Sequence, residues 1–434
     1  MVDTLAYLFT TVIVIAIPAC YIARIAKKTR RAKTRRKEAI DKGQVEPVSL
    51  YPKIDPIRCI GTAACVPVCP EGDILGILNG SAELVSPTKC IGHGACEAAC
   101  PVDAITLVFG TEHRGVEIPF VSETFETNVE GIYIAGELGG MGLIRNAMTQ
   151  GKEAVDYIGQ SLSKGYKNVH DIAIVGAGPA GIAATLQAQK NKLKYINLEQ
   201  DDIGGTVLSY PRQKLVMTQP MEIPLYGKVK FREIIKEELM DLWADVLKKT
   251  GVEIRTKEKV ESVERQNGFF RIRSSKGEYL AQRVLLAIGR RGTPRKLGVS
   301  GEKSSKVAYC LLEPEQYRGR KVLVVGGGDS AIEAALSLSE QRGTQVTLSY
   351  RKNVFSRIKE MNENRLNNAL AAGQITSILE SNVVEIKRHV VAIQQKGDVK
   401  SIPNDYVLIF AGGELPSEFL KKMGIRVEKK FGQR

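Results

Sequence analysis

The sequence has little cysteine outside one short stretch. Six of the eight cysteines in 434 residues lie between residues 59 and 100, and the other two, Cys20 and Cys310, stand alone. This distribution excludes a disulfide framework that spans the chain. No C-x-x-C pair is present either, so the chain lacks a dithiol of the kind that cycles to an intramolecular disulfide.

Excess positive charge is also scarce outside one run. The net charge is +14, but residues 27–37 (KKTRRAKTRRK) hold eight basic residues and no acidic ones. Taking these eight from +14 leaves +6 for all the other residues. The excess charge is therefore local and forms no extended binding face, so nucleic acid is not an expected partner.

Residues 5–25 (LAYLFTTVIVIAIPACYIARI) lack charge until Arg24. As a helix they extend about 30 Å at about 1.5 Å per residue, which matches the hydrocarbon layer. Only Asp3 precedes them and the basic run follows, which favours a retained anchor over a cleaved signal peptide. We expect a transmembrane anchor over residues 1–26 and a basic linker near inner membrane lipid over residues 27–46. The N-terminus then lies outside and the rest in the cytoplasm at the cytoplasmic membrane; a buried core helix is the alternative.

The cysteine-rich stretch contains an internal repeat. Residues 59–70 read CIGTAACVPVCP and residues 90–101 read CIGHGACEAACP, so C-x5-C-x3-C-P occurs twice, 31 residues apart. Two copies with the same spacing are poorly explained by chance. The repeated cysteines are Cys59, Cys65 and Cys69 in the first copy and Cys90, Cys96 and Cys100 in the second.

Residues 47–112 resemble a bacterial dicluster ferredoxin, in which the fourth cysteine of each motif binds the other motif's cluster. In both copies here the second cysteine of the family motif is replaced, by Thr62 and by His93. Three thiolates suit a [3Fe–4S] cluster, or a [4Fe–4S] cluster with water or a non-cysteine ligand. His93 is a candidate ligand because imidazole binds iron; otherwise it is a surface side chain or a hydrogen-bond donor to cluster sulfur. The resemblance implies one cluster on Cys59, Cys65 and Cys100 and another on Cys90, Cys96 and Cys69.

Residues 171–184 (DIAIVGAGPAGIAA) read as a strand, a glycine-rich turn and a helix. Such glycines let the backbone approach a pyrophosphate at a helix N-terminus. A second strand ends at Glu199, near the distance expected for a ribose-binding acid. The candidate residues of this dinucleotide site are Gly176, Gly178, Pro179, Gly181, Glu199, Gly204, Gly205 and Thr206.

Residues 321–340 (KVLVVGGGDSAIEAALSLSE) repeat the pattern. Their second strand ends in Arg351 and Lys352 and has no acid there. Cations at this place favour the extra phosphate of NADPH, whereas a carboxylate favours NADH. The alternative is that both cations only solvate a loop. The candidate residues are Gly326, Gly328, Asp329, Ser330, Ala331, Arg351 and Lys352.

The order of the first glycine motif, VLLAIGRRGTP (residues 285–295) and GGGDSA resembles the thioredoxin-reductase-like flavoproteins. The GGT and MTQPMEIPLYGK stretches resemble the bacillithiol-disulfide-reductase-like branch, over about residues 113–434. The resemblance implies FAD at the first site and NAD(P)H at the second. Those reductases carry C-x-x-C before GGGDSA, where this chain has Cys310 alone, so we do not expect disulfide reduction.

In that family a final segment of the form T-x-x-x-G-I-Y-x-A-G-D completes the flavin site. Here the matching letters, TNVEGIYIAGE, lie in residues 125–158, before the first glycine motif. We interpret this as a circular permutation, which compact domains tolerate because their termini often lie close together. The resemblance then implies that Gly136 and Glu137 contact the flavin.

We therefore expect an α/β chain with two Rossmann-like dinucleotide-binding domains, for FAD and NAD(P)H, an α+β ferredoxin domain and one N-terminal transmembrane helix. The expected domains after the linker are a dicluster ferredoxin domain (47–112), a permuted C-terminal piece of the FAD domain (113–165), the FAD-binding domain (166–296), the NAD(P)H-binding domain (297–403) and a return segment of the FAD domain (404–434).

The expected function is that of a membrane-anchored NAD(P)H-linked flavin and iron–sulfur oxidoreductase. It passes electrons between NADPH, FAD, two clusters and an unidentified redox partner at the cytoplasmic membrane face. Cofactors carry this chemistry, so we name no catalytic acid or base. Alternatives are a flavin-dependent oxidase or monooxygenase, a non-catalytic redox sensor, and an electron-transfer subunit of a larger membrane complex.

Overall fold

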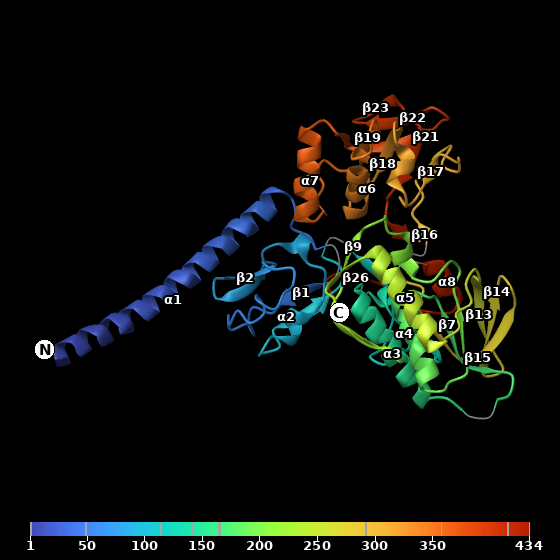
Figure 1. Cartoon of the computed structure of the whole chain (residues 1–434), viewed down its shortest axis with the longest axis horizontal. Coiled ribbons are helices and arrows are strands. Elements are labelled where there is room, and N and C mark those ends of the chain that lie inside the picture. Colours follow the sequence, from blue (N-terminus) through green and yellow to red (C-terminus); the bar gives the residue numbers. More distant parts are fainter. Residues whose placement is uncertain are drawn as a thin grey trace. The chain divides into compact units, whose positions relative to one another are not determined.

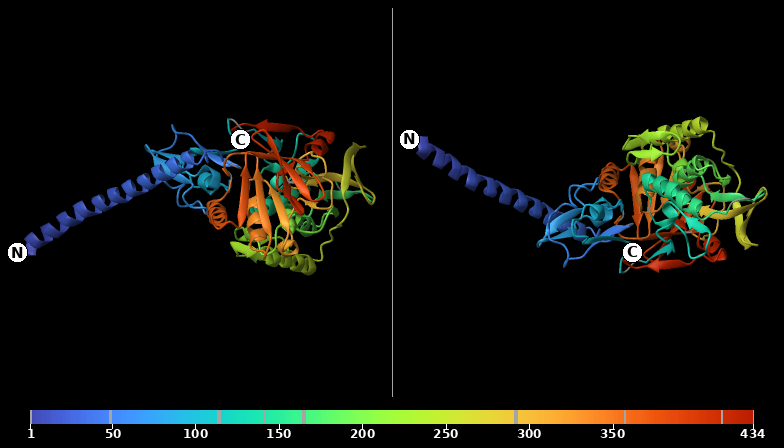
Figure 2. Two further views of the ribbon diagram at one scale, coloured as in Figure 1. Left: turned by 90° about the horizontal axis from the view of Figure 1, so that it is seen from above. Right: turned by 90° about the horizontal axis from the view of Figure 1, so that it is seen from below.

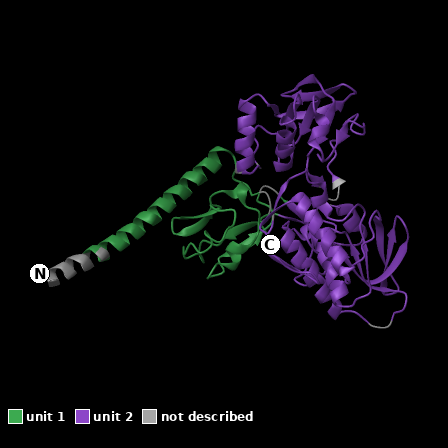
Figure 3. Cartoon of the chain, viewed as in Figure 1, with its two compact units in different colours: residues 1–115, 431–434 green, residues 116–430 purple. Residues whose placement is uncertain are grey.

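A computed structural model gives the fold of the chain (Figure 1). It forms two compact units, residues 1–115 with 431–434 (unit 1) and residues 116–430 (unit 2), coloured separately in Figure 3. The chain therefore crosses between the units twice. The structure describes residues 2–47, 50–112, 115–140, 142–163, 166–290, 293–356, 358–414 and 416–433.

Unit 1 begins with a single long helix, α1 (Val2–Asp41). The segment predicted as a linker over residues 27–46 is helical as far as Asp41. It forms a helix because it is rich in helix-forming lysine, arginine and alanine. Its buried Ala32 packs on Leu78 and Val85 of the domain that follows. Among the described residues, no helix is both long enough and apolar enough to cross a membrane. The anchor predicted over residues 1–26 includes residues 1–11 and 13, whose side chains lie outside the described part of the chain, and it stays a prediction.

The rest of unit 1 is built from short strands and turns. Two antiparallel pairs form, β1 with β4 and β2 with β3, and α2 lies within the second cysteine motif. Near the C-terminus, the backbone N–H of Phe109 donates to the carbonyl of Gln433 at 2.8 Å. The C-terminal residues therefore join this unit, which the sequence did not predict. The elements are β1 (Tyr51–Ile54), β2 (Leu75–Leu78), β3 (Ser81–Leu84), η1 (Pro87–Lys89), α2 (Ala95–Ala98) and β4 (Ile105–Val108).

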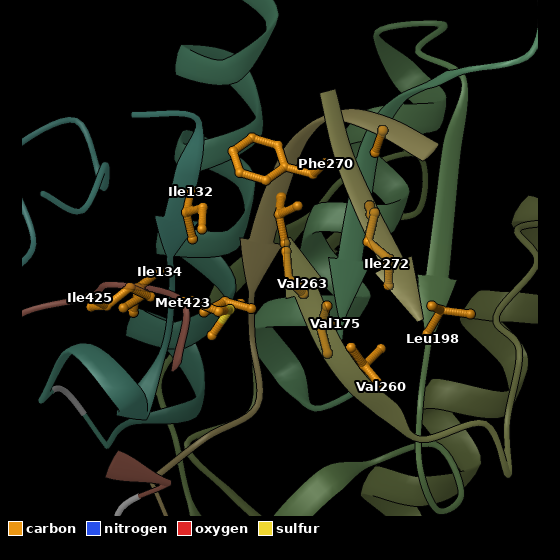
Figure 4. Packing of buried hydrophobic residues seen from close by; sticks show 14 of the residues in the cluster. Ile132, Ile134, Val175, Leu198, Val260, Val263, Phe270, Ile272, Met423 and Ile425 are labelled. Carbon is orange, nitrogen blue, oxygen red and sulfur yellow. The ribbon is translucent and has the colours of Figure 1, made fainter. Parts of the chain in front are cut away.

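Unit 2 contains a six-stranded sheet in the order β13-β14-β15-β7-β8, with β6 also paired to β15. Strands β6, β15, β7 and β8 are parallel, and their apolar runs are buried as expected for a sheet covered on both faces. Figure 4 shows the core that forms against this sheet, including Ile132, Val175 and Ile272. The strands are β6 (Ile132–Ile134), β7 (His170–Val175), β8 (Tyr195–Leu198), β13 (Val260–Gln266), β14 (Phe269–Ser274) and β15 (Glu278–Leu286).

Helices and hairpins surround the six-stranded sheet. Helices α3 and α4 pack closely against each other, since a Cβ built on Gly151 would lie 2.1 Å from the carbonyl oxygen of Ala180. The helical elements are η2 (Glu137–Gly139), α3 (Ile144–Gln160), α4 (Pro179–Lys190), η3 (Gly205–Ser209) and α5 (Lys236–Thr250). The hairpin strands are β9 (Leu215–Met217) with β12 (Glu233–Ile235) and β10 (Met221–Ile223) with β11 (Gly227–Val229).

A second, five-stranded parallel sheet has the order β17-β24-β18-β19-β20. Figure 2 shows its orange and red strands side by side. Its strands are β17 (Val307–Ala308), β18 (Lys321–Val325), β19 (Gln345–Tyr350), β20 (Ile375–Leu379) and β24 (Tyr406–Ile409). Its other elements are η4 (Pro314–Tyr317), α6 (Asp329–Ser339), α7 (Glu360–Ala371) and a meander of β21 (Ser381–Ile386), β22 (Val390–Gln395) and β23 (Asp398–Pro403).

The C-terminal segment that packs against the six-stranded sheet begins after β24, and so later than the predicted residue 404. Strand β24 belongs to the second sheet, so the return segment does not begin at residue 404. Its apolar side chains Leu420, Met423 and Ile425 then join the core of the first sheet. The remaining elements are β5 (Val116–Pro119) with β26 (Val427–Lys430), β16 (Thr293–Pro294) with β25 (Gly413–Glu414), and α8 (Ser417–Lys422).

Candidate functional site

The first glycine loop connects β7 to α4 at the carboxyl edge of the six-stranded sheet. Gly176 has φ +107°, and a Cβ on it would lie 2.6 Å from the carbonyl oxygen of Ala287. A Cβ on Gly181 would lie 1.9 Å from the carbonyl oxygen of Gly176. Gly178 is the N-cap of α4 and Pro179 is its first residue, so the free N–H groups of the helix start here. This loop fits a pyrophosphate, which binds at such a helix N-terminus.

Glu199 lies buried at the end of β8, beside the glycine loop. Its carboxylate accepts hydrogen bonds from the backbone N–H of Ala177 at 2.6 Å and of Asp201 at 2.8 Å. Burial raises the pKa of Glu199, and these hydrogen bonds offset part of that rise. The carboxylate therefore braces the loop from behind. Its contact with a ribose stays a prediction.

The GGT stretch lies against the same loop. The backbone N–H of Gly204 donates to the carbonyl of Ala177 at 2.9 Å. A Cβ on Gly205 would lie 2.9 Å from the Cα of Gly178, so the two backbones touch. Thr206 follows within η3.

The segment TNVEGIYIAGE (residues 127–137), which stands last in the family's usual order, also reaches this edge. Strand β6 runs parallel to β15, and Gly136 follows it with φ +84°. A Cβ on Gly136 would lie 3.0 Å from the Cβ of Ala180 in the first turn of α4. The structure thus brings Gly136 and Glu137, the first residue of η2, beside the first glycine loop.

Sequence reasoning missed Arg290, which follows β15. Its guanidinium donates to the carbonyl oxygen of Glu117 at 3.1 Å. Burial lowers the pKa of Arg290, and the nearby charges of Glu137 and Glu117 oppose that change. The only available signal was the pair of arginines directly after the apolar strand in VLLAIGRRGTP.

The second glycine loop connects β18 to α6. Gly326 has φ +150°, and a Cβ on it would lie 2.6 Å from the carbonyl oxygen of Phe410 and 3.0 Å from the Cβ of Ala331. A Cβ on Gly327 would enter the ring of Tyr350. Gly328 is the N-cap of α6, and Ser330 lies in the helix's first turn. This loop fits a second dinucleotide for the same reasons as the first.

Asp329 makes contacts that the sequence did not predict, and its contact with a cofactor stays a prediction. Its Oδ1 accepts hydrogen bonds from the backbone N–H of Lys359 at 2.8 Å and from Nδ2 of Asn362 at 2.7 Å. The carboxylate therefore ties the start of α7 to the glycine loop. Arg351 and Lys352 lie exposed directly after β19. They begin the connection from β19 to α7, and Asp329 holds the other end of that connection at Lys359.

The cysteines of unit 1 gather in the two sets that the ferredoxin resemblance implies. Cys69, Cys90, Cys96 and His93 line one cavity. Burial raises the pKa of both Cys90 and Cys96 to about 11, and neighbouring thiols of the same set add to the rise. Burial also raises the pKa of Cys65, and the charges of Cys59 and Cys100 raise that pKa further.

Among the described residues, no three His, Cys, Asp or Glu side chains are arranged to hold one metal ion. In a cluster each iron takes its own thiolate. Backbone N–H groups also point at cysteine sulfur, from Ala82 to Cys59 at 3.3 Å and from Ala104 to Cys100 at 3.2 Å. Such hydrogen bonds tune cluster potentials.

With this geometry in view, a model of the pyridine nucleotide-disulphide oxidoreductases matches residues 173–433. The chain belongs to this family. A 4Fe-4S dicluster domain model matches residues 51–101. The chain is therefore a pyridine-nucleotide flavin oxidoreductase fused to a dicluster ferredoxin domain, as predicted, and the families imply FAD, NAD(P) and 4Fe–4S chemistry.

Two curated relatives differ in the acceptor that their names give. A ferredoxin–NADP reductase of Ignicoccus hospitalis is 28% identical over 267 residues, which cover 60% of this chain and 83% of that protein. Bacilliredoxin reductase Bdr of Bacillus subtilis is 26% identical over 267 residues, covering 60% and 82%. The solved bacillithiol disulfide reductase Bdr of Bacillus cereus has a TM-score of 0.56 at 27% identity, covering 60% of this chain and 83% of that one.

Cys310, the one cysteine in residues 116–430, lacks the lowered pKa that is typical of a redox-active thiol. Cys310 is half-buried and unpaired with another cysteine. Burial raises its pKa, and the charge of Lys236 offsets only part of the rise. A thiol with a raised pKa is a poor nucleophile at neutral pH.

Proposed function

We propose that the protein passes electrons between NADPH and a one-electron protein carrier, through FAD and two iron–sulfur clusters. When bound, NADPH would supply two electrons as a hydride, FAD would convert between two-electron and one-electron transfer, and each cluster would exchange single electrons. The observation that carries the proposal is the presence, in one chain, of two dinucleotide cradles and two three-thiol sets, without a dithiol in the flavoprotein part.

The chain's own residues bind and orient in this scheme. The N-terminus of α4, behind the loop that starts at Gly176, holds the FAD pyrophosphate, and the corresponding end of α6 holds that of NADPH. Arg351 and Lys352 hold the 2′-phosphate of NADPH. Gly136 and Glu137 close the flavin site. The cluster cysteines hold the iron.

We also infer that the flavin domain is circularly permuted. Strand β6 precedes the first glycine motif in the chain, yet it lies beside β15 in that motif's sheet. The family model matches residues 173–433, and the Ignicoccus hospitalis relative and the solved Bacillus cereus reductase each leave about a sixth of their own length unmatched. A segment moved from the end of the domain to its start accounts for both observations.

The test is an anaerobic titration of the full-length protein with NADPH, followed by visible absorption and low-temperature EPR. Bleaching of the flavin together with new cluster signals is the expected result. The matched control is the same titration of a Cys65→Ser, Cys96→Ser double variant, in which the flavin should bleach without cluster signals. Flavin bleaching with unchanged wild-type clusters would overturn the relay and favour a redox sensor.

A further inference from the structure

The cavity of the second cluster is lined by an acid that the sequence motif does not include. Cys69, Cys90 and Cys96 share this cavity with His93 and with Glu71. Glu71 follows Cys69 within one tight turn, which the backbone N–H of Gly72 closes on the carbonyl of Cys69 at 3.1 Å. The acid is therefore fixed close to one of the presumed iron ligands.

The half-buried Glu71 lines the same cavity as the three cysteines that would bind iron. The cavity walls include the buried apolar side chains of Ile74, Leu75 and Leu107. Three cysteine sulfurs become negative when they bind iron, and a fourth negative group beside them adds repulsion. Only the positive charge of the metal makes such a group of anions favourable in an apolar cavity.

The internal repeat shows that the acid belongs to one cluster alone. Glu71 follows Cys69-Pro70, and the equivalent residue after Cys100-Pro101 is Val102. Because the fourth cysteines are exchanged between the clusters, Glu71 belongs to the second cluster and Val102 to the first. Two cluster sites with the same ligands would need the same residue after each Cys-Pro pair, but the chain has Glu71 in one copy and Val102 in the other.

The backbone around His93 has the same conformation as the backbone around Thr62 in the first copy. His93 lies between Gly92 and Gly94, which have φ +72° and +87°. The equivalent Thr62 of the first copy lies between Gly61 and Ala63, whose φ values are also positive, +68° and +61°. The same unusual backbone thus occurs with an imidazole in one copy and a hydroxyl in the other.

We propose that the Glu71 carboxylate is the fourth, non-cysteine ligand of the second cluster, so that the two clusters are chemically unequal. The inference rests on the proposed cluster function. Oxygen from a carboxylate is an accepted ligand for iron. The second cluster then carries one more negative charge than the first, which has three thiolates only, and its midpoint potential is the lower of the two.

The experiment is an EPR-monitored redox titration of the full-length protein with a chemical reductant, after anaerobic loading with iron and sulfide. Glu71→Gln should raise the midpoint potential of one cluster, change its EPR signal and leave the other cluster unchanged. Asp73→Asn is the matched control. It removes the same charge two residues away, from an exposed side chain that pairs with Arg35 and does not line the cavity. It should shift neither cluster.

A second variant covers the case in which Glu71→Gln fails to assemble. Glu71→Cys should restore two clusters and give the second an all-thiolate EPR signal, and failure of this variant to hold a second cluster contradicts the proposal. Equal behaviour of Glu71→Gln and Asp73→Asn also overturns it. So does a strongly coupled ¹⁴N signal in pulsed EPR that His93→Gln abolishes. Because the reductant is chemical, these outcomes are independent of whether NADPH reduces the clusters, which tests the proposed function.

Discussion

Removing the cations after β19 should convert the enzyme from NADPH toward NADH. The changes are Arg351→Ala, Lys352→Ala and the double replacement. Both side chains are exposed and lie one and two residues beyond β19, the strand that pairs with β18 before the glycine loop. They form no part of the core, so the fold should survive their loss.

The size of the effect follows from the exposure of the two cations. Two unit charges 4 Å apart attract by about 1 kcal/mol in bulk water and by about 4 kcal/mol at the effective dielectric of a protein surface. Exposed side chains stay near the lower end, so we expect about 1 to 2 kcal/mol for each cation. That is roughly a 5- to 30-fold rise in the KM for NADPH per replacement. NADH lacks the phosphate, and its KM should change by less than about twofold.

The assay is steady-state reduction of an artificial one-electron acceptor with NADPH and with NADH, at two ionic strengths. Raising the salt should increase the KM for NADPH in the wild type, because the Debye length falls to about 10 Å at 0.1 M. It should have little effect in the double variant. Lys400→Ala is the control, since Lys400 is an equally exposed cation on β23 of the same domain.

Two results would refute this reasoning. One is an unchanged ratio of the two KM values in the double variant, which would leave Arg351 and Lys352 as solvated loop residues. The other is an equal loss for NADPH and NADH, which would indicate a general effect on the binding loop. A drop in kcat with both KM values unchanged would likewise place the cations outside nucleotide recognition.

Four further outcomes are expected. Gly151→Val should lower the free energy of unfolding by about 1 to 3 kcal/mol and reduce FAD retention, because its side chain would meet the backbone of Ala180; thermal melting and flavin absorbance measure both. Cys96→Ser should remove one of two clusters by iron analysis while NADPH still bleaches the flavin. Cys310→Ser should leave NADPH oxidation within about twofold of wild type, and complete loss would restore a thiol mechanism. Although burial alone would raise the pKa of Glu302, hydrogen bonds from two backbone N–H groups and a tyrosine hydroxyl hold that pKa below its usual range. The stability that ionised Glu302 contributes is therefore full above about pH 4.5 and is lost as the pH falls through its pKa in the folded state. Thermal melts of the wild type at a series of pH values should show this loss, and Glu302→Gln should remove that part of the pH dependence.

The local parts of the sites were predictable because each rests on a short-range steric or chemical requirement. Gly176 and Gly326 have positive φ and backbone oxygens within 3 Å of an added Cβ, so only glycine fits. The spacing of the cysteine motifs likewise carried over to the two sets in space. Even the early segment with Gly136 could be placed, because its letters match a strand that the flavin sheet needs.

The failures concern features that depend on distant partners. The sequence did not reveal that the carboxylate of Asp329 accepts a hydrogen bond from the start of α7, thirty residues further along the chain. It also did not reveal that the oxygens of Glu199 accept hydrogen bonds from the backbone of Ala177 and Asp201. Strand β24 was assigned to the wrong sheet, since an apolar run carries no mark of its neighbours. No local pattern reveals such contacts.

The absence of a second thiol beside Cys310 decides how electrons can leave the flavin. In a disulphide oxidoreductase that route is a dithiol, yet each described cysteine outside the cluster motifs stands alone. The only other acceptors that the sequence supplies are the two thiol sets of unit 1, which the family match assigns to 4Fe–4S chemistry. Burial raises the pKa of Cys90 and Cys96 to about 11, so iron must displace their protons when it binds at neutral pH. These features support the proposal that electrons leave the flavin one at a time, through the clusters.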